Sequence, residues 1–185
     1  MEVLKTSIPE VILFRPRVFS DARGSFFESY NQNSIREIGI TNIFVQDNQS
    51  QSSKGVLRGL HYQLGEYAQA KLVRVIKGSV YDVAVDIRKG SPTYGKYFGA
   101  ILSEENKLQM LVPRGFAHGF IVLEDETIFA YKCDNFYHKA SEGGIIWNDS
   151  SIGIDWQMDT KDILLSEKDE VLPNLENCLN DFVYG

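Results

Sequence analysis

Short apolar runs separated by turn residues recur along the chain. Runs of this kind, bounded by Gly, Asn, Asp and Ser, predict β-strands. They cover residues 25–30, 42–47, 55–63, 71–76, 79–88, 96–102, 108–112, 119–123, 127–133 and 144–148. Only residues 31–39 and 164–172 predict short helices, the second with Ser166 as its N-cap. About ten strands with so little helix predict an all-β fold, a sandwich or a jelly roll.

One hairpin is predicted around Lys77-Gly78, which suits a two-residue turn. Its register would place Val73 opposite Asp82, so that Lys71 and Asp82 become diagonal neighbours on one face. On these residues alone, the simpler interpretation of that pair is an ion pair on a solvated face.

A second hairpin is predicted through the acidic turn around Glu124 and Asp125. With an even number of loop residues, His118 would share a face with Tyr131. A buried tyrosine often has one hydrogen-bonded partner, so a core contact and a functional contact both stay open for this pair.

The composition is that of an ordinary globular protein. We expect a single domain over residues 1–185, because this length is enough to bury a sizeable core. The formal net charge of −6 argues against a sequence-independent nucleic-acid binder, which needs a basic surface. Cys133 and Cys178 make no disulfide framework, and the sequence has neither a signal-peptide pattern nor a membrane span. It therefore predicts a cytoplasmic protein with reduced thiols and with no nucleic-acid or membrane partner.

The stretch VLRGLHYQ, residues 56–63, places an arginine and a histidine inside an apolar strand. Strict alternation would send Arg58 and His61 to opposite faces. Gly59 lies between them, and a glycine tolerates a bulge that re-aims one side chain. Without further residues, a solvated arginine and a hydrogen-bonded core histidine explain this stretch.

The segment PRGFAHGF has the spacing Pro113-x-Gly115-x-x-His118. This spacing resembles the second motif of the cupin superfamily, a β jelly roll with its ligand site inside the barrel. Metal-binding cupins also have a first motif with two histidines one residue apart, and here only His61 occupies that position. Because a catalytic metal site usually needs three protein ligands, the resemblance implies a cupin-like barrel with no metal and no other cofactor.

A site with histidine, tyrosine, lysine and aspartate suits proton transfer. Histidine is the natural base at neutral pH, tyrosine can return a proton, and lysine can stabilise an oxyanion. These groups suit removal of a proton next to a carbonyl and its return from another direction, which is the chemistry of an epimerase.

The resemblance to one family extends along nearly the whole chain. It is carried by the ordered blocks VFSDARGSFFESYN, FVQDNQS, VLRGLHYQ, AKLVRVIKGSVYDVAVDIRKGSPTYG, LVPRGFAHGF, YKCDNFYHKASEGGIIWND, IGIDW and LSEKD. With these blocks the chain resembles the dTDP-4-dehydrorhamnose 3,5-epimerases, which are metal-independent isomerases of the cupin superfamily.

The resemblance implies catalytic roles for four residues. His61 matches the general base, and Asp169 matches the carboxylate that orients it. Tyr131 matches the general acid on the opposite face of the sugar, and Lys71 matches the lysine that stabilises the enolate oxygen.

It also implies a set of residues that bind the nucleotide-sugar. These are Arg23, Phe26, Glu28, Gln46, Asn48, Arg58, His118, Tyr137, Glu142 and Lys168. Tyr137 matches the aromatic that stacks on thymine. Phe26 and Glu28 match an N-terminal segment that reaches into the partner subunit's site, which implies a homodimer.

The implied reaction converts dTDP-4-dehydro-6-deoxy-D-glucose to dTDP-4-dehydro-L-rhamnose, by epimerisation at C3 and C5 through an enolate, in dTDP-L-rhamnose biosynthesis. Two other interpretations stay open. One is a single-centre epimerase or ketoisomerase on a nucleotide 4-keto-6-deoxy sugar, and the other is a catalytically silent cupin that binds nucleotide-sugars. A metal-dependent oxygenase is disfavoured by the missing second histidine.

The resemblance changes the interpretation of VLRGLHYQ. Arg58 would meet the diphosphate and His61 the hexose, so both side chains must reach one cavity. We therefore predict an irregularity near Gly59, or an Arg58 that curls over the barrel rim.

Overall fold

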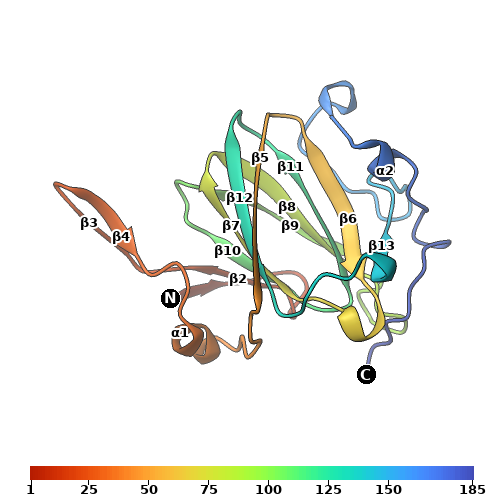
Figure 1. The fold of residues 1–185 in the computed structure, drawn as a ribbon, viewed down its shortest axis with the longest axis horizontal. Coiled ribbons are helices and arrows are strands. Elements are labelled where there is room, and N and C mark those ends of the chain that lie inside the picture. The colour runs from red at the N-terminus through yellow and green to blue at the C-terminus, as the bar shows by residue number, and fades with distance from the viewer.

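Two antiparallel sheets form the body of the molecule in the computed structural model, which describes residues 1–185 (Figure 1). One sheet has the order β1 (Glu2–Leu4), β2 (Ile12–Arg15), β10 (Gln109–Val112), β7 (Lys71–Lys77), β12 (Thr127–Cys133) and β5 (Gln46–Ser52). The other has the order β13 (Glu142–Gly144), β6 (Leu57–Gln63), β11 (Phe116–Val122), β8 (Ser79–Asp86) and β9 (Tyr97–Ser103). The chain passes repeatedly from one sheet to the other, as in a jelly roll, which confirms the predicted all-β class.

The helical segments are short. Both predicted helices are present, as α1 (Gln32–Glu37) and α2 (Glu167–Glu170), and Ser166 caps α2 by accepting the backbone N–H of Asp169. Single 3₁₀ turns occupy Gly65–Tyr67, Lys139–Ser141 and Thr160–Asp162. Neither α-helix has the length or the apolar character needed to cross a bilayer.

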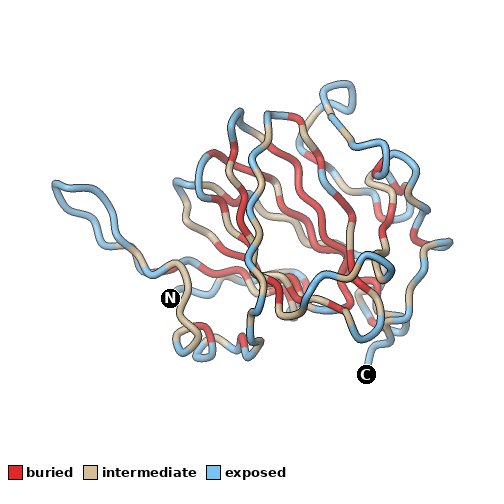
Figure 2. The backbone as a smooth tube through the Cα atoms, in the orientation of Figure 1, coloured by how far each residue is buried: buried red, intermediate tan, exposed pale blue.

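Apolar side chains from both sheets pack in much of the space between them. The strands that carry these side chains are largely buried (Figure 2). Val73 and Phe129 come from the six-stranded sheet, and Ala84 and Phe120 come from the five-stranded sheet. The rings of Phe120 and Phe129 stack with their centroids 4.0 Å apart. Because each fully buried side chain of this size contributes about 1.5–3 kcal/mol, this interior holds the two sheets together.

The C-terminal part of the chain covers the outer face of the five-stranded sheet. Ile145, Trp156 and Leu175 belong to the same buried cluster as Val83 and Val85 of β8. This packing brings α2 beside β6, although the two elements are far apart in sequence (Figure 1).

The strands β3 (Val18–Asp21) and β4 (Gly24–Phe27) form a hairpin that extends away from the two sheets, at the left of Figures 1 and 2. Two of its aromatic side chains lie open to solvent, Phe19 with 52% and Phe26 with 72% of its surface exposed. A single hairpin is marginally stable in water, and exposed aromatic side chains often mark a contact surface. We call residues 18–27 the arm.

Neither of the two predicted hairpins exists. β7 pairs with β10 and β12, whereas β8 pairs with β9 and β11, so the chain crosses between the sheets at Gly78. β11 and β12 also lie in different sheets. The predicted pairs therefore do not share a sheet face. Lys71 and Asp82 instead interact from opposite sheets across the interior, and His118 lies against Phe129, whose ring neighbours Tyr131. A turn residue indicates that the chain reverses, but not that the next strand pairs with the previous one.

Some strand boundaries also differ from the predictions. The strand expected over 42–47 is β5, which starts at Gln46 and continues through polar residues to Ser52. The strand expected over 144–148 is the short β13, which ends at Gly144. The sequence pattern missed β1, β2 and β3.

Candidate active site

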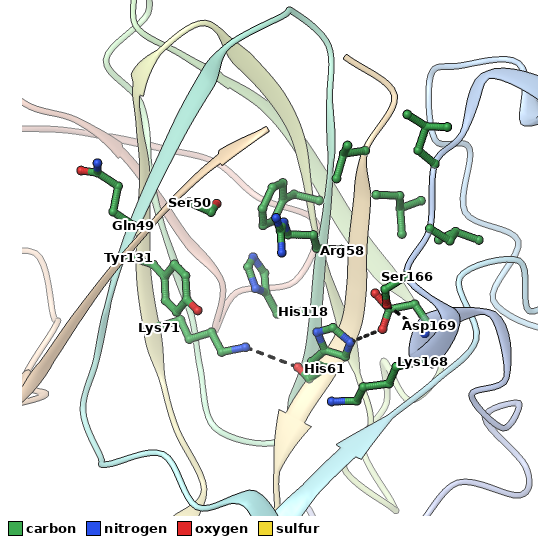
Figure 3. Close-up of a pocket in the computed structure, with 15 residues that line it drawn as sticks. Gln49, Ser50, Arg58, His61, Lys71, His118, Tyr131, Ser166, Lys168 and Asp169 are labelled. Carbon is green, nitrogen blue, oxygen red and sulfur yellow. Dashed lines mark hydrogen bonds and ion pairs between the residues drawn. The ribbon is translucent and has the colours of Figure 1, made fainter. Parts of the chain in front are cut away.

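A cavity of about 430 Å³ lies between the two sheets and is bordered by α2 (Figure 3). Its polar lining is Gln49, Ser50, Arg58, His61, Lys71, His118, Tyr131, Ser166, Lys168 and Asp169. The four residues predicted to carry the chemistry are all in this set. The volume is in the range of pockets that hold small molecules.

His61 and Asp169 form one His–Asp pair in this cavity. Nε2 of His61 lies 2.6 Å from Oδ1 of Asp169, and the two side chains are 34% and 5% exposed. Burial disfavours the charge on Asp169, but hydrogen bonds from His61, the Gly59 backbone and Ser166 together hold the pKa of Asp169 below its usual value. An ionised Asp169 accepts the Nε2–H proton, which leaves Nδ1 of His61 free to act as a base.

Arg58 and His61 reach the same cavity because β6 is bulged at Gly59. Phe120 and His118 are two residues apart on β11, whereas their partners Arg58 and His61 are three residues apart on β6. Gly59 has a φ of +136°, and a Cβ there would lie 2.5 Å from the backbone of β11. Only glycine fits this position, and the irregularity predicted near Gly59 is confirmed.

A second His–Asp pair lies deeper in the barrel. Nε2 of His118 is 3.0 and 3.1 Å from the two carboxylate oxygens of Asp82, and these side chains are 6% and 0% exposed. Burial raises the pKa of Asp82 and lowers the pKa of His118. Asp82 was not among the predicted site residues, although an aspartate in the middle of the apolar run VYDVAV was a visible signal.

Lys71 and Tyr131 enter the cavity from the six-stranded sheet, opposite His61 (Figure 3). The Lys71 ammonium donates to the backbone carbonyl of His61 at 3.5 Å. Burial lowers the pKa of Lys71, and burial raises the pKa of Tyr131. A molecule in the cavity therefore meets a histidine on one side, a protonated tyrosine on the other and an amine between them.

Four more of the predicted binding residues line an adjoining cavity of about 120 Å³. These are Gln46, Asn48, Tyr137 and Glu142, and the small cavity shares His61, Lys71 and Tyr131 with the large one. The backbone N–H of Tyr137 donates to Oε1 of Gln46 at 3.0 Å. Lys168 of α2 pairs with Glu142 of β13 at 2.6 Å, so the structure brings these two residues together at the cavity.

Three predicted binding residues do not line either cavity. Arg23 and Phe26 lie on the arm and Glu28 follows it, outside both linings. Arg23 pairs with Asp21 at 2.6 Å, within the arm itself. A role for these residues in a cavity would require the cavity of a second copy of the chain.

Three further cavity residues, Gln49, Ser50 and Phe120, were not among the predicted site residues. Gln49 and Ser50 lie on β5, whose residues are all polar and show no hydrophobic alternation. No cluster of three or more histidine, cysteine, aspartate or glutamate side chains that could hold a metal ion is present. Cys133 and Cys178 are both free thiols.

Known proteins resemble this chain over almost its full length. The family model for dTDP-4-dehydrorhamnose 3,5-epimerase matches residues 5–177. The dTDP-4-dehydrorhamnose 3,5-epimerase of Shigella flexneri is 59% identical over 170 residues, which cover 91% of this chain and 93% of that protein.

Solved structures agree with the sequence comparison. The dTDP-4-dehydrorhamnose 3,5-epimerase of Elizabethkingia anophelis superposes with a TM-score of 0.91 at 53% identity, covering 96% of this chain and 97% of that one. The dTDP-6-deoxy-D-glucose-3,5-epimerase of Legionella pneumophila, in complex with dTDP-4-keto-L-rhamnose, has a TM-score of 0.91 at 48% identity and covers 95% of this chain and 93% of that one. The predicted resemblance is confirmed, and the chain belongs to the dTDP-4-dehydrorhamnose 3,5-epimerase family of isomerases.

Proposed function

We propose that this protein epimerises C3 and C5 of dTDP-4-dehydro-6-deoxy-D-glucose to give dTDP-4-dehydro-L-rhamnose, with His61 as base and Tyr131 as acid. The observation that carries the proposal is the position of these two side chains on opposite sides of one cavity (Figure 3). Inversion of a carbon requires that a proton leaves one face and returns on the other. Membership of the epimerase family supports the same reaction.

In the proposed mechanism the C4 ketone acidifies the protons on C3 and C5. His61 accepts one of these protons, and the ionised Asp169 stabilises the imidazolium that forms. Lys71 donates to the developing enolate oxygen. Tyr131 then gives its proton to the opposite face of the carbon. His61 releases its proton to solvent and Tyr131 takes one up from solvent, and a second cycle inverts the other centre.

The remaining cavity residues would hold the nucleotide-sugar. Arg58 donates to Ser52 Oγ at 3.3 Å, and its other guanidinium N–H groups are left for a diphosphate, which a planar fork binds well. Tyr137 is 52% exposed and offers its ring face to thymine. Gln46, Asn48, His118, Glu142 and Lys168 complete the proposed contacts.

The proposal includes a homodimer. Arg23, Phe26 and Glu28 lie outside the cavities of their own chain, and an arm that extends into solvent can place them at the cavity of a partner. We further propose that residues 1–185 act as one domain, that the reaction needs no cofactor, and that the enzyme works in the cytoplasm, where its thiols stay reduced.

Solvent exchange tests the proposal directly. Chelator-treated protein is incubated with dTDP-4-dehydro-6-deoxy-D-glucose in D₂O, and C3 and C5 are followed by NMR. We expect deuterium at both carbons together with the L-rhamno product, because each inversion takes its new proton from solvent.

Other outcomes separate the alternatives. Deuterium at one carbon only would indicate a single-centre epimerase at the same site. Binding of the nucleotide-sugar without exchange at either carbon would indicate a silent binding protein and would contradict the proposal.

A further inference from the structure

The carboxylate of Asp82 is fully buried, and the proposed mechanism gives it no task. Its two oxygens lie at nearly equal distances, 3.0 and 3.1 Å, from a single atom, Nε2 of His118. A carboxylate placed in this way accepts one N–H that is shared between both of its oxygens.

The other ring nitrogen of His118 faces the cavity. No buried side-chain nitrogen or oxygen lacks a hydrogen-bond partner in this structure. Nδ1 of His118 has no partner within the chain, so it must be open to the space that His118 lines. The two nitrogens therefore have different roles, one held by Asp82 and one available to a ligand.

The surroundings favour the neutral ring. Burial disfavours charge on His118 and outweighs the opposing effect of Asp82. The nearby cations of Lys71 and, when protonated, His61 disfavour the charge further, so the pKa of His118 lies below its usual value. A neutral imidazole carries one proton, and the carboxylate holds that proton on Nε2. Nδ1 then offers a lone pair.

We propose that Asp82 is a positioning residue, which holds His118 in the neutral Nε2–H tautomer so that Nδ1 accepts a hydrogen bond from a hydroxyl group of the bound sugar. In this arrangement His118 cannot donate from Nδ1 to a phosphate oxygen, and it selects a hydroxyl donor instead. The identity of the ligand as a sugar rests on the proposed function, whereas the tautomer does not.

The first test needs no variant. The chain has only three histidines, so a long-range ¹H–¹⁵N spectrum of uniformly labelled protein shows three rings, and His118→Asn identifies the ring concerned by the loss of its signals. We expect the pattern of a neutral Nε2–H ring for His118 at neutral pH. A proton on Nδ1, alone or together with one on Nε2, would overturn the proposal.

The second test replaces the carboxylate. In Asp82→Asn the amide can present either its oxygen or its NH₂ group to Nε2, so we expect a second tautomer in the spectrum. We also expect kcat/KM to fall by about tenfold or more, as is usual when a partner that orients a functional histidine is lost. Unchanged kcat/KM together with an unchanged tautomer would overturn the proposal.

Asp86→Asn is the matched control. Asp86 lies on the same strand and is equally buried, but its partners are Arg88, Ser91 and Thr93 and it does not line the cavity. We expect this variant to lower the unfolding temperature while the His118 signals and kcat/KM stay as in the wild type. An equal loss of activity in both variants would mean that any buried carboxylate has this effect, and would contradict a specific role for Asp82.

The outcomes also separate this inference from the proposed function. If wild-type protein catalyses no exchange in D₂O, the proposed function fails, but the tautomer of His118 can still be measured. If exchange occurs and the ring is not an Nε2–H tautomer, only the inference about Asp82 fails.

Discussion

The two His–Asp pairs contain the same chemical groups, yet the pKa values of their carboxylates are shifted in opposite directions. The pKa of Asp169 lies below its usual value, whereas the pKa of Asp82 is raised. Asp169 accepts from His61, from the Gly59 backbone and from Ser166, whereas His118 is the one hydrogen-bond donor to Asp82, which is buried completely. The comparison shows that the balance between burial and hydrogen-bond donors around a carboxylate, and not the presence of a histidine, decides the sign of the pKa shift.

The difference extends to the two histidines. His61 is 34% exposed at the cavity and can exchange a proton with a ligand or with solvent, whereas His118 is 6% exposed. Pairs of titratable groups whose environments separate their pKa values often mark a division of tasks in an active site. In the two proposals, His61 is a base that changes its protonation state, and His118 is a ring that keeps one tautomer.

The largest effect is expected from the exposed pair. His61→Asn should fold normally and lower kcat by roughly 10²-fold or more, because the general base is lost. Turnover and solvent exchange are measured together. His138→Asn is the control, since His138 stacks on Tyr67 outside both cavity linings and the change should leave kcat near the wild-type value. Full activity in His61→Asn would remove His61 from the mechanism.

Tyr131→Phe tests the acid that faces this base. We expect a loss of roughly 10²-fold in product formation, because a proton can still leave the substrate but is not returned on the opposite face. Some exchange into the starting sugar should remain, and NMR in D₂O detects it. Tyr97→Phe on β9 serves as the comparison, since Tyr97 lines neither cavity. Unaltered inversion in Tyr131→Phe would point to another acid.

A third buried carboxylate, Asp86, shows how much stability a lowered pKa contributes, and so provides a reference for the two His–Asp pairs. Burial opposes the charge on Asp86, but Arg88, Ser91 and Thr93 hold its pKa at about 2. A carboxylate whose pKa is lower in the folded than in the unfolded state stabilises the fold at pH values above the unfolded pKa. This stabilisation is lost as the pH falls toward 2. We expect Asp86→Asn to cost about 2 kcal/mol in the free energy of unfolding at pH 7, and much less near pH 2. Denaturant unfolding at both pH values measures the difference, and a cost that does not depend on pH would contradict the assignment.

The smallest and sharpest effect compares the pairs themselves. In Asp169→Asn we expect a loss of about 1 kcal/mol at pH 7, because the folded state there favours the charged carboxylate. In Asp82→Asn we expect no loss or a gain, because the raised pKa of Asp82 means that its charge costs stability above that pKa. The urea midpoints of the two variants at the same pH test this prediction. A loss of stability in both variants would contradict the opposite pKa shifts of Asp169 and Asp82.

The sequence predicted the elements better than their partners. Apolar runs located β7, β8 and β12 almost residue by residue, because buried strands carry continuous hydrophobic signals. β5 was misplaced because QDNQSQS is polar throughout and owes its strand conformation to pairing with β12. The two hairpins were wrong because pairing depends on which sheet the next strand joins, and local sequence does not contain that information.

The site residues were also predicted only in part, because local sequence does not show which strands lie side by side. His61, Lys71, Tyr131 and Asp169 were identified through resemblance to the family, and the structure places all four at one cavity. The bulge at Gly59 followed from the need of two side chains to reach one ligand. Asp82 was interpreted only as an ion-pair partner of Lys71, because its pairing with His118 depends on β8 and β11 lying side by side, which local sequence does not reveal.

The crossing of the chain between the two sheets affects the order in which the protein folds. His61 and Asp169 are 108 residues apart, and the strands between them must be in place before α2 can dock beside β6. Contacts between such distant segments form slowly, because the chain loses the entropy of loop closure before the contacts can stabilise it. A nascent chain can thus expose His61 long before its carboxylate partner has been synthesised. In refolding from denaturant, the circular dichroism of the sheets should return first, and catalytic activity only with the final docking of the C-terminal segment.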